Sequence, residues 1–408
     1  MQQITKCRAE KIKDSRGEET LEVGMSVGEF TVGASVPAGK STGSREAVAV
    51  PVDDAIRNVN EIIAPQLIGK KVDVFAVDDF LVSLDGTENK SKLGANAILG
   101  VSIAVLKLEA KIVGQPLWQH IQSLSAPSAK DFGDNLINQS VRFPRLFVNV
   151  LNGGAHAEFK LPFQEYMFVL GNGMKATGPV EQMQILFGQL EKKLKGLGKE
   201  IKMGDEGGFS FQSDNLEEPF EILSELHDKL AIDVAGGEFF DGGKYSVLGK
   251  KYFSDELLEV YENLVKKFPI VSIEDPFSEN DFGGFKKIAE KMKDLGVSPP
   301  SEVLIVGDDL TTTNVEMIEK AIEEKMINAV LIKPNQIGTV TETLQAIEMT
   351  HTAGLKTIIS HRSGETADSF IADLAVGVGA YGIKAGALSQ SERMAKYDRL
   401  VEIEKEVS

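Results

Sequence analysis

Short apolar segments alternate with helical segments from about residue 145 onward, and this alternation restricts the possible folds more than any other feature of the chain. The apolar segments are LAIDVA (230–235), IVSIEDP (270–276), VLIVGDD (303–309), AVLIKPN (329–335), KTIISHRS (356–363) and YGIKAG (381–386). Amphipathic helical patterns lie between them, at 254–267, 285–295, 315–326 and 340–353. Strands that alternate with helices form a parallel sheet, and strands that are apolar throughout are covered on both faces. The pattern predicts an α/β fold with a barrel of β/α units.

The first 125 or so residues have a mixed pattern, typical of a small α+β domain. Its predicted elements are a hairpin formed by 21–27 and 30–36, and helices at 52–64, 75–84 and 96–112. Gly28 lies in the hairpin turn, and Pro65 is expected to end the first helix. Segment 123–138 is rich in turn-forming residues. We therefore expect an N-terminal α+β domain at 1–130, and the barrel at 140–408.

Composition and charge exclude several classes of protein. The chain has 408 residues, of which 42% are hydrophobic and 26% are charged, as in ordinary globular proteins. Its 44 Lys and Arg against 61 Asp and Glu give a net charge of −17, which disfavours binding to nucleic acid or to an anionic membrane. Cys7 is the single cysteine, and neither a signal peptide nor a membrane-spanning segment is recognisable. We expect a cytoplasmic protein.

An ionisable residue stands at the end of each apolar segment: Asp233, Glu274, Asp308, Lys333, His361 and Lys384. In a barrel, the C-terminal ends of the strands meet on one face, where catalytic residues lie. One such charge alone would be interpreted as a cap of the next helix. Six in succession need partners or a metal, because unpaired charges are costly to bury. The six residues are therefore predicted to lie around one active site.

Three of the six, Asp233, Glu274 and Asp308, are carboxylates on consecutive predicted strands. A ligand set made of oxygen alone suits a hard cation such as Mg²⁺, which keeps positions for water or substrate. For a single Asp, a helix cap or a surface ion pair would be the simpler interpretation. The triplet favours a Mg²⁺ site, and it disfavours softer metals because it includes neither His nor Cys.

Lys333 and the pair formed by Arg362 and Ser363 each have two interpretations. A lysine that is partly desolvated and near other cations has a lowered pKa and can act as a general base, whereas beside a metal-binding carboxylate it forms an ion pair. The sequence leaves these two alternatives for Lys333 nearly equal. A guanidinium followed by a hydroxyl at a helix start suits a phosphate group. The alternative for Arg362 and Ser363 is ordinary helix capping by SGET (363–366).

Further candidate site residues lie upstream: His156 in NGGAH, Gln164 and Glu165 in FQEYM, and Glu206 in MGDEGG. Either glutamate can serve as a general acid, or it can pair with Lys333 or Lys384. A Gly-rich turn that ends in histidine is by itself a weak indication of a site. The remaining histidines are interpreted as structural or solvent-exposed residues without partners: His120, His227 and His351. The single tryptophan, Trp118, is interpreted as a packing residue.

The segment PAGKSTG (37–43) is similar to a phosphate-binding P-loop, but a P-loop needs glycine at position 34, where Ala34 stands. A nucleotide hydrolase of that type is therefore the least favoured function. A lid that carries Ser41 to the mouth of the barrel is the better interpretation.

A series of motifs extends along nearly the whole chain: DSRG (14–17), STG with Glu46 and Ala47, LDGT (84–87), NKSKLGANAILGVS (89–102), NVLNGG, QEY, GDEGG, SIEDPF, GDDLTTTN, KPNQIGT, SHRSGET and SERMAKY. With these motifs in this order, the chain resembles the enolase family, the phosphopyruvate hydratases of glycolysis. The resemblance implies a small N-terminal α+β lid domain followed by a modified (β/α)8 TIM-type barrel, whose first strands and helices depart from simple alternation. It also implies a homodimer or a larger homo-oligomer.

The resemblance further implies the reversible dehydration of 2-phosphoglycerate to phosphoenolpyruvate, with two Mg²⁺ ions per active site. The ligands of the first ion would be Asp233, Glu274 and Asp308, and Ser41 would meet the second, which binds only with substrate. Lys333 is similar to the base that removes the C2 proton. Glu206 is similar to the acid that assists departure of the 3-hydroxyl group, with Glu165 beside it.

The implied substrate-binding residues are His156, Gln164, Glu165, His361, Arg362, Ser363 and Lys384. Within this set, the resemblance assigns the phosphate to Arg362 and Ser363, and it assigns stabilisation of the enolate to Lys384. His361 is also counted among the implied catalytic residues. Together with the metal ligands, these residues define the expected site.

One departure from the family pattern lies next to the expected second ion. Where the family usually reads SGASTG, this chain reads AGKSTG, which places Lys40 beside Ser41. Lys40 would either add a contact to the phosphate or repel the second Mg²⁺. Two alternative functions remain: a related acid-sugar dehydratase or racemase, and a weakly active paralogue with a binding or scaffold role. The intact catalytic positions and the phosphate pair favour the enolase reaction over both.

Overall fold

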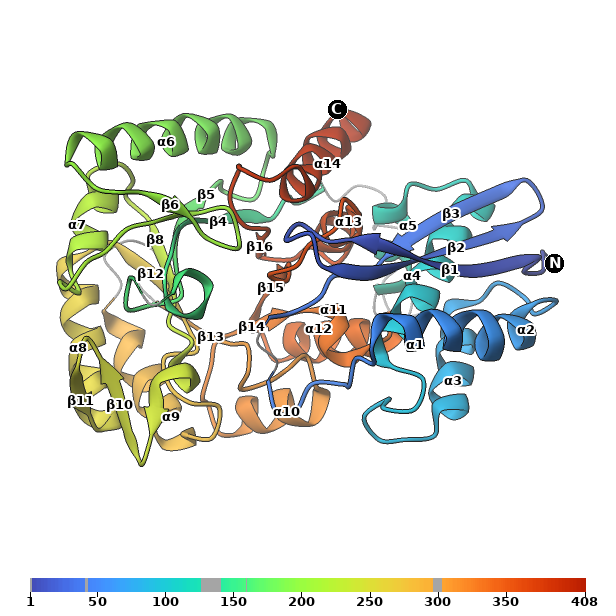
Figure 1. Ribbon diagram of the computed structural model, residues 1–408, viewed down its shortest axis with the longest axis horizontal. Helices are drawn as coiled ribbons and strands as arrows, with labels where there is room; N and C mark the ends of the chain where they lie inside the picture. The colour runs from blue at the N-terminus through green and yellow to red at the C-terminus, as the bar shows by residue number, and fades with distance from the viewer. Residues whose placement is uncertain (1, 41–42, 126–140, 159, 296–302) are drawn as a thin grey trace.

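The computed structural model of the chain describes residues 2–40, 43–125, 141–158, 160–295 and 303–408. It contains an N-terminal part built on a three-stranded sheet, drawn in blue to cyan in Figure 1, and a closed barrel drawn in green to red. The two parts lie side by side along the long axis of the molecule, and most of the predicted linker 123–138 falls outside the described residues. Within those residues, no helix combines the length and the apolar character needed to cross a membrane.

The N-terminal sheet is antiparallel and consists of β1 (Lys6–Lys13), β2 (Glu19–Val27) and β3 (Phe30–Ser35). The predicted hairpin is confirmed, and Gly28 in its turn has a φ of 57°, which glycine adopts without steric conflict. The helices that follow are α3 (Val74–Asp85), α4 (Ala95–Val113) and α5 (Leu117–Ser125). Helix α4 packs on β2 and β3 and is buried over most of its surface, as its apolar sequence predicted.

The helix predicted at 52–64 continues past its expected end. It consists of α1 (Val52–Arg57), the π-helical segment η1 (Asn58–Ile63) and α2 (Ala64–Leu67). Pro65 lies in the first turn of α2 and has no backbone N–H to donate. The missing hydrogen bond is tolerated because the wider π-helical turn that precedes α2 has changed the hydrogen-bond register. The prediction that Pro65 ends the helix is therefore wrong.

The barrel closes through eight strands among the described residues: β4 (Arg145–Asn152), β5 (Glu165–Leu170), β8 (Leu230–Asp233), β12 (Ile270–Glu274), β13 (Leu304–Gly307), β14 (Ala329–Ile332), β15 (Lys356–Ser360) and β16 (Gly382–Lys384). Neighbours in this order pair with one another, and β16 pairs with β4. Strand β5 is antiparallel to β4 and β8, whereas the other pairs are parallel. Because β4 and β5 follow each other directly, the start of the barrel departs from simple alternation, as expected.

Helices cover the outside of the barrel (Figure 1): α6 (Thr177–Gly196), α7 (Glu218–Ser224), α8 (Ser254–Lys267), α9 (Phe282–Lys291), α10 (Val315–Glu323), α12 (Val340–Thr352), α13 (Phe370–Gly377) and α14 (Ser391–Val407). Shorter elements are β6 (Lys202–Met203), β7 (Phe209–Ser210), β9 (Phe240–Asp241), β10 (Lys244–Val247), β11 (Lys250–Tyr252), α11 (Pro334–Ile337), η3 (Gly154–Ala157), η4 (Gly236–Phe239) and η5 (Met292–Asp294). Helix α9 begins before the predicted residue 285, because the Asp281 side chain accepts a hydrogen bond from the backbone N–H of Gly284 (2.9 Å) and so caps an earlier turn.

A packed core fills the inside of the barrel: Phe147, Met167, Val169, Ala231, Leu304, Val306, Ala329, Leu331 and Ile358. Alternate residues of a strand point to the same face. The inward-facing series therefore continues from Ala231 to Asp233, from Val306 to Asp308, and from Leu331 to Lys333. In the antiparallel β5, Glu165 precedes Met167, so it reaches the same end of the barrel. Strand alternation thus places charged side chains around the axis at one end of the barrel.

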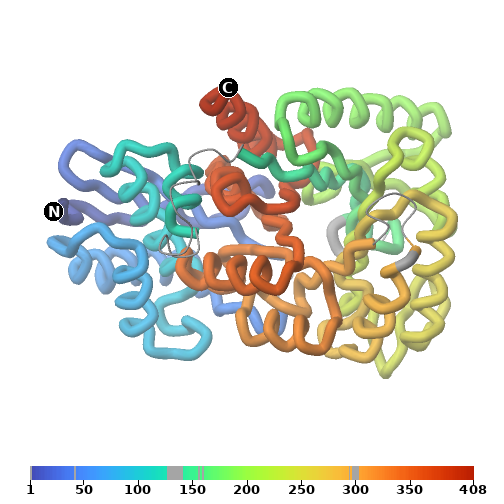
Figure 2. Tube along the Cα trace, turned by 180° about the vertical axis from the view of Figure 1, so that it is seen from behind, coloured from blue at the N-terminus to red at the C-terminus, as the bar shows by residue number. Residues whose placement is uncertain are grey.

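The N-terminal part is fastened to the barrel by helix packing and by polar contacts. Helix α5 packs against α13, and α3 packs against α12, which is visible from behind in Figure 2. Lys90 Nζ lies 2.8 Å from Glu342 Oε1 and has a buried side chain. Ala38 and Gly364 exchange two backbone hydrogen bonds of 2.9 Å. These last contacts hold the loop after β3 over the mouth of the barrel.

Candidate active site

One pocket at the C-terminal ends of the strands brings most of the predicted residues together. Its lining includes Gln164, Glu165, Glu206, Asp233, Asp308, Lys333, His361, Arg362, Ser363 and Lys384. Glu274 lies just behind this lining, against the ammonium group of Lys384. Gly39 and Glu46 also line the pocket, so the loop after β3 covers one side of it. The chemical role of each residue stays a prediction.

Lys384 lies among buried carboxylates. Its Nζ is 3.0 Å from Asp233 Oδ2, 2.8 Å from Glu274 Oε2 and 3.0 Å from Glu165 Oε2. These partners come from β8, β12 and β5. A buried ammonium group is tolerated because such partners compensate for its desolvation. Since the carboxylates outnumber the ammonium group, a further cation would be favoured here.

Burial and mutual repulsion raise the pKa values of these carboxyl groups. The pKa of Glu274 is well above its ordinary value because of burial and then the charge of Asp233, and the pKa of Glu165 is raised by burial and by Glu206. Burial opposes the charge of Lys384, but the surrounding carboxylates outweigh burial and raise its pKa well above the ordinary value. Metal binding at such carboxyl groups displaces protons.

Lys333 forms an ion pair with Asp308, the third predicted metal ligand. Gln336 Nε2 donates a hydrogen bond of 2.8 Å to the other carboxylate oxygen of Asp308. Burial lowers the pKa of Lys333, but the attraction of Asp308 outweighs both burial and the repulsion by Arg362 and Lys384, so the pKa is raised. The raised pKa belongs to the ion-paired lysine, and the role of Lys333 as a base stays a prediction. Of the two alternatives left by the sequence, the ion pair is the one that the structure contains.

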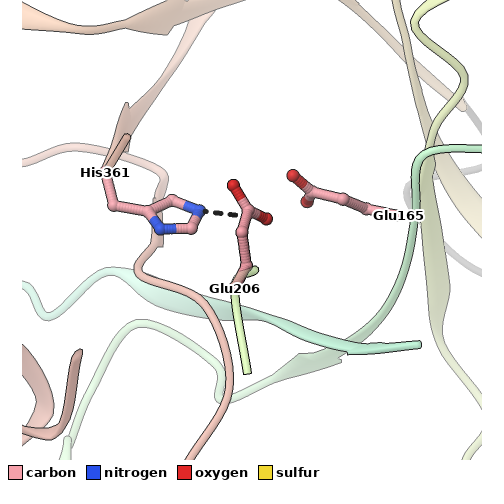
Figure 3. A group of neighbouring side chains, drawn as sticks. All are labelled: Glu165, Glu206 and His361. Carbon is pink, nitrogen blue, oxygen red and sulfur yellow. Dashed lines mark ion pairs between the residues drawn. The ribbon is translucent and has the colours of Figure 1, made fainter. Parts of the chain in front are cut away.

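Glu206 and Glu165 lie close together in the pocket, with His361 on the other side of Glu206 (Figure 3). His361 Nε2 is 3.8 Å from Glu206 Oε2, and Asn149 Nδ2 donates a hydrogen bond of 2.8 Å to the same oxygen. Burial lowers the pKa of His361 well below its ordinary value, and the charge of Arg393 adds to this effect against the opposing charge of Glu206. Burial therefore favours the neutral form of the His361 imidazole beside Glu206.

Arg362 and Ser363 lie where the loop after β3 meets the barrel. The two terminal nitrogens of Arg362 contact the carboxylate of Glu46 at 3.0 and 3.1 Å, and Nη1 also donates to Asn335 Oδ1 at 2.9 Å. Ser363 Oγ accepts a hydrogen bond of 2.7 Å from the backbone N–H of Lys40. This geometry places a guanidinium and a hydroxyl side by side at the pocket wall, as recognition of a phosphate requires.

The donor set of the pocket fits a hard divalent cation. Asp233, Glu274 and Asp308 offer buried carboxylate oxygens from three adjacent strands, and Gln164 Oε1 is buried with no hydrogen-bond partner among the described residues. Two tight groups of potential ligand atoms also exist there: Glu165, Glu206 and His361, and Asp275, Asp308 and Asp309. The oxygen-rich chemistry of these groups agrees with Mg²⁺ as the expected ion.

Several lining residues were missed by reasoning from the sequence. Glu46 binds Arg362 across the two parts of the chain, and no local pattern indicates such a pairing. Asp275 accepts hydrogen bonds from the backbone N–H groups of Asp308 (3.0 Å) and Asp309 (2.6 Å), and so it fixes the strand end that carries Asp308. Its position directly after Glu274 was the available signal.

The histidines outside the pocket have structural partners: His120 Nε2 lies 3.1 Å from Glu109 Oε2, His227 Nε2 lies 2.9 Å from Val169 O, and His351 Nε2 lies 2.8 Å from Thr357 Oγ1. Trp118 is buried and donates to Glu406 Oε2 at 2.9 Å. Their structural interpretation agrees with these contacts, whereas the expectation that the histidines lack partners is wrong.

Lys40 reaches across the mouth of the pocket. Its Nζ lies 2.7 Å from Asp205 Oδ2, next to Glu206 in the chain. The two expectations for Lys40, a phosphate contact or repulsion of a metal, stay predictions. Ser41 lies outside the described residues, as does the side chain of His156.

Lys40→Ala should therefore have a small effect. The two paired side chains are 48% and 31% exposed, and such pairs contribute less than about 1 kcal/mol to the free energy of unfolding. We expect chemical denaturation to show a loss within that limit, and the KM for substrate to rise less than about fivefold. A much larger rise in KM with unchanged stability would place the ammonium group on the substrate.

The fold and the pocket together define an enzyme of the capped β/α-barrel class, with buried carboxylates and cations at the strand ends. The family model described as "Enolase, C-terminal TIM barrel domain" matches residues 140–408, and the one described as "Enolase, N-terminal domain" matches residues 4–121. The chain is 42% identical to an enolase of Methanopyrus kandleri over 440 aligned positions, which cover 100% of this chain and 97% of the relative. It is also 42% identical to an enolase of Ureaplasma parvum, with 98% and 95% covered. The chain belongs to the enolase family.

Proposed function

We propose that this protein catalyses the Mg²⁺-dependent, reversible dehydration of 2-phosphoglycerate to phosphoenolpyruvate. The observation that carries the proposal is the convergence of Lys333, Glu206 and the phosphate pair Arg362–Ser363 on one pocket with buried carboxylates. The enolase relatives at 42% identity over the full length support the same reaction. The reaction is a carbon–oxygen elimination, so the protein is a lyase.

In this proposal, Lys333 accepts the proton from C2, and Glu206 gives a proton to the hydroxyl group that leaves C3. The electron pair of the C2–H bond forms the C2=C3 double bond, and the departing hydroxyl becomes water. Glu165 and His361 flank Glu206 and keep its carboxyl group oriented, and His156 and Gln164 complete the pocket. Removal of a proton next to a carboxylate is difficult, because negative charge accumulates on that carboxylate.

Asp233, Glu274 and Asp308 would hold the first Mg²⁺, and Ser41 would contact a second, substrate-dependent ion. When bound, Mg²⁺ supplies positive charge that stabilises the negative charge of the substrate carboxylate. Lys384 adds a fixed positive charge beside these ligands. Arg362 and Ser363 hold the phosphate, for which Arg362 exchanges part of its pairing with Glu46.

Mg²⁺ should stabilise the fold more at higher pH. Because the pKa of Glu274 in the folded protein lies above its usual value of 4.5, the folded protein binds protons more tightly than the unfolded chain, so stability falls as pH rises above 4.5. Mg²⁺ competes with those protons and offsets this loss, by about 2.7 kcal/mol when its concentration is 100 times its Kd. Thermal denaturation with Mg²⁺ or EDTA should show a gain in Tm that increases with pH.

Two variants test whether the gain comes from the proposed ligands. Asp233→Asn and Glu274→Gln should abolish most of it. Asp73→Asn changes a half-buried residue that caps α3 away from the pocket; it keeps its capping ability and should keep the full gain. An equal Mg²⁺ effect in all three variants would argue against this ligand set.

We also propose a cellular location, a domain division and an oligomeric state. The single buried Cys7 supports a cytoplasmic location, and the two family models, which end at residue 121 and begin at 140, support the division into domains at 1–130 and 140–408. The homodimer or larger homo-oligomer rests on the family resemblance, and light scattering would test it.

Substrate choice tests the proposed function against a related acid-sugar dehydratase. We expect enol phosphate to form, as measured by ultraviolet absorbance, from 2-phosphoglycerate with Mg²⁺, and no dehydration of glycerate that lacks the phosphate. Because Arg362 and Ser363 are assigned to the phosphate, Arg362→Gln should raise the KM for 2-phosphoglycerate about tenfold or more. Equal rates with phosphorylated and unphosphorylated acids would contradict the assignment.

A further inference from the structure

A second pocket lies at the opposite, N-terminal end of the barrel. Arg145 begins β4, Lys356 begins β15, and Tyr381 directly precedes β16, and these three strands are neighbours in the barrel. Backbone hydrogen bonds from Arg145 N to Tyr381 O and from Tyr381 N to Thr357 O, both 3.0 Å long, hold the three strand starts together. Within the described residues, this pocket shares no lining residue with the catalytic pocket.

The lining of the second pocket is basic, although the net charge of the chain is −17. Arg142, Arg145 and Lys356 contribute three positive charges, and no described Asp or Glu lines the pocket. In the described part of the chain, no ion pair neutralises any of the three. The cations of the catalytic pocket, by contrast, are paired with carboxylates. The second pocket therefore has a local surplus of positive charge.

An aromatic ring holds two of these cations without neutralising them. The ring centroid of Tyr381 lies 4.2 Å from Arg145 Cζ and 5.8 Å from Lys356 Nζ. Cation–π contacts orient a charged group but leave its charge in place. His351 lines the same pocket, and burial together with the charge of Lys356 lowers its pKa. Two of the three positive charges thus lie against the ring and stay available to an anion.

We propose that this second pocket binds a small multivalent oxyanion of the phosphate class. Guanidinium and ammonium groups are the side chains that recognise phosphate most strongly, through charge-assisted hydrogen bonds. The exposed side chain of Asn172 lines the same space and can complete the coordination. The proposal does not depend on the catalytic reaction, because the two pockets lie at opposite ends of the barrel.

Calorimetric titration of the full chain with inorganic pyrophosphate, in the presence of EDTA, tests the proposal. We expect binding by the wild-type protein, and an affinity at least about tenfold lower in Arg145→Gln/Lys356→Gln, because two charged hydrogen-bond donors are removed. The matched control Lys286→Gln/Lys287→Gln removes the same charge from exposed positions on α9 and should leave the affinity unchanged. Circular dichroism verifies that each variant folds. If the double variant does not fold, the single variant Lys356→Gln, which changes an exposed residue, is measured in its place.

Arg362→Gln separates the second pocket from the catalytic one. It should leave pyrophosphate binding at the second pocket intact. Loss of binding in Arg362→Gln together with unchanged binding in the double variant would assign pyrophosphate to the catalytic pocket and overturn the proposal. Absence of binding by the wild-type protein, or equal affinities in the double variant and its control, would overturn it as well.

Discussion

Lys333→Ala should lower the turnover of 2-phosphoglycerate by about 10²–10⁴-fold, the usual contribution of a general base. The methyl group cannot accept the C2 proton, and no other described lysine lies beside Asp308 at the pocket wall. Exchange of the C2 hydrogen with solvent deuterium, followed by NMR, should be lost to the same degree. Loss of exchange is more informative than loss of turnover, because it reports on proton removal alone.

Loss of an ion pair could also weaken the fold, so Lys333→Ala needs a matched variant. Lys90→Ala removes a buried lysine that lies 2.8 Å from Glu342, away from the pocket. It should cost stability, as Lys333→Ala does, and yet keep normal exchange and turnover. If Lys333→Ala exchanged the C2 hydrogen at the wild-type rate, Lys333 would be the structural partner of Asp308 and another group would be the base.

Glu206→Gln should separate the two halves of the reaction. An amide keeps the size of the side chain and its hydrogen bond with Asn149, but it cannot donate a proton to the leaving hydroxyl. We expect turnover to fall by about 10²–10⁴-fold, while exchange of the C2 hydrogen continues because Lys333 is untouched. Both quantities can be measured in one NMR experiment in deuterated buffer.

The matched variant for Glu206→Gln is Glu109→Gln. Glu109 faces His120 at 3.1 Å in the N-terminal part, as Glu206 faces His361 in the barrel. Glu109→Gln should keep both exchange and turnover. Loss of exchange in Glu206→Gln, with the fold intact, would show that Glu206 acts before or during removal of the proton and would contradict its role as the acid for the second step.

The barrel and the direction of its charged residues were predictable from short-range patterns. Each apolar segment predicts a strand, and the ionisable residue at its end predicts a charged side chain at the C-terminal end of the barrel. Because alternate residues of a strand point to the same side, the side chains that face the barrel core are followed by charged side chains that face the site. Ala231 and Asp233 illustrate this directly. The small N-terminal sheet was predictable for the same reason, from alternation on both sides of Gly28.

Features that depend on tertiary contacts could not be decided from the sequence. The sequence left the ion pair of Lys333 as one of two alternatives, and the choice depends on how two adjacent strand ends are placed in three dimensions. The pairing of Arg362 with Glu46 joins the two parts of the chain. The helix that continues through Pro65 depends on a local π-helical turn, which residue propensities do not signal. Local sequence predicts elements and their faces, whereas these features depend on tertiary contacts.

The central claim is that this pocket interconverts 2-phosphoglycerate and phosphoenolpyruvate, and the most direct test is to measure the reaction from both sides. Purified protein saturated with Mg²⁺ is incubated in one sample with 2-phosphoglycerate and in another with phosphoenolpyruvate, and the absorbance of the enol phosphate is followed. We expect both samples to reach the same final ratio, and excess EDTA to stop the change in each. No change in either sample, from folded protein with Mg²⁺ present, would contradict the proposed reaction.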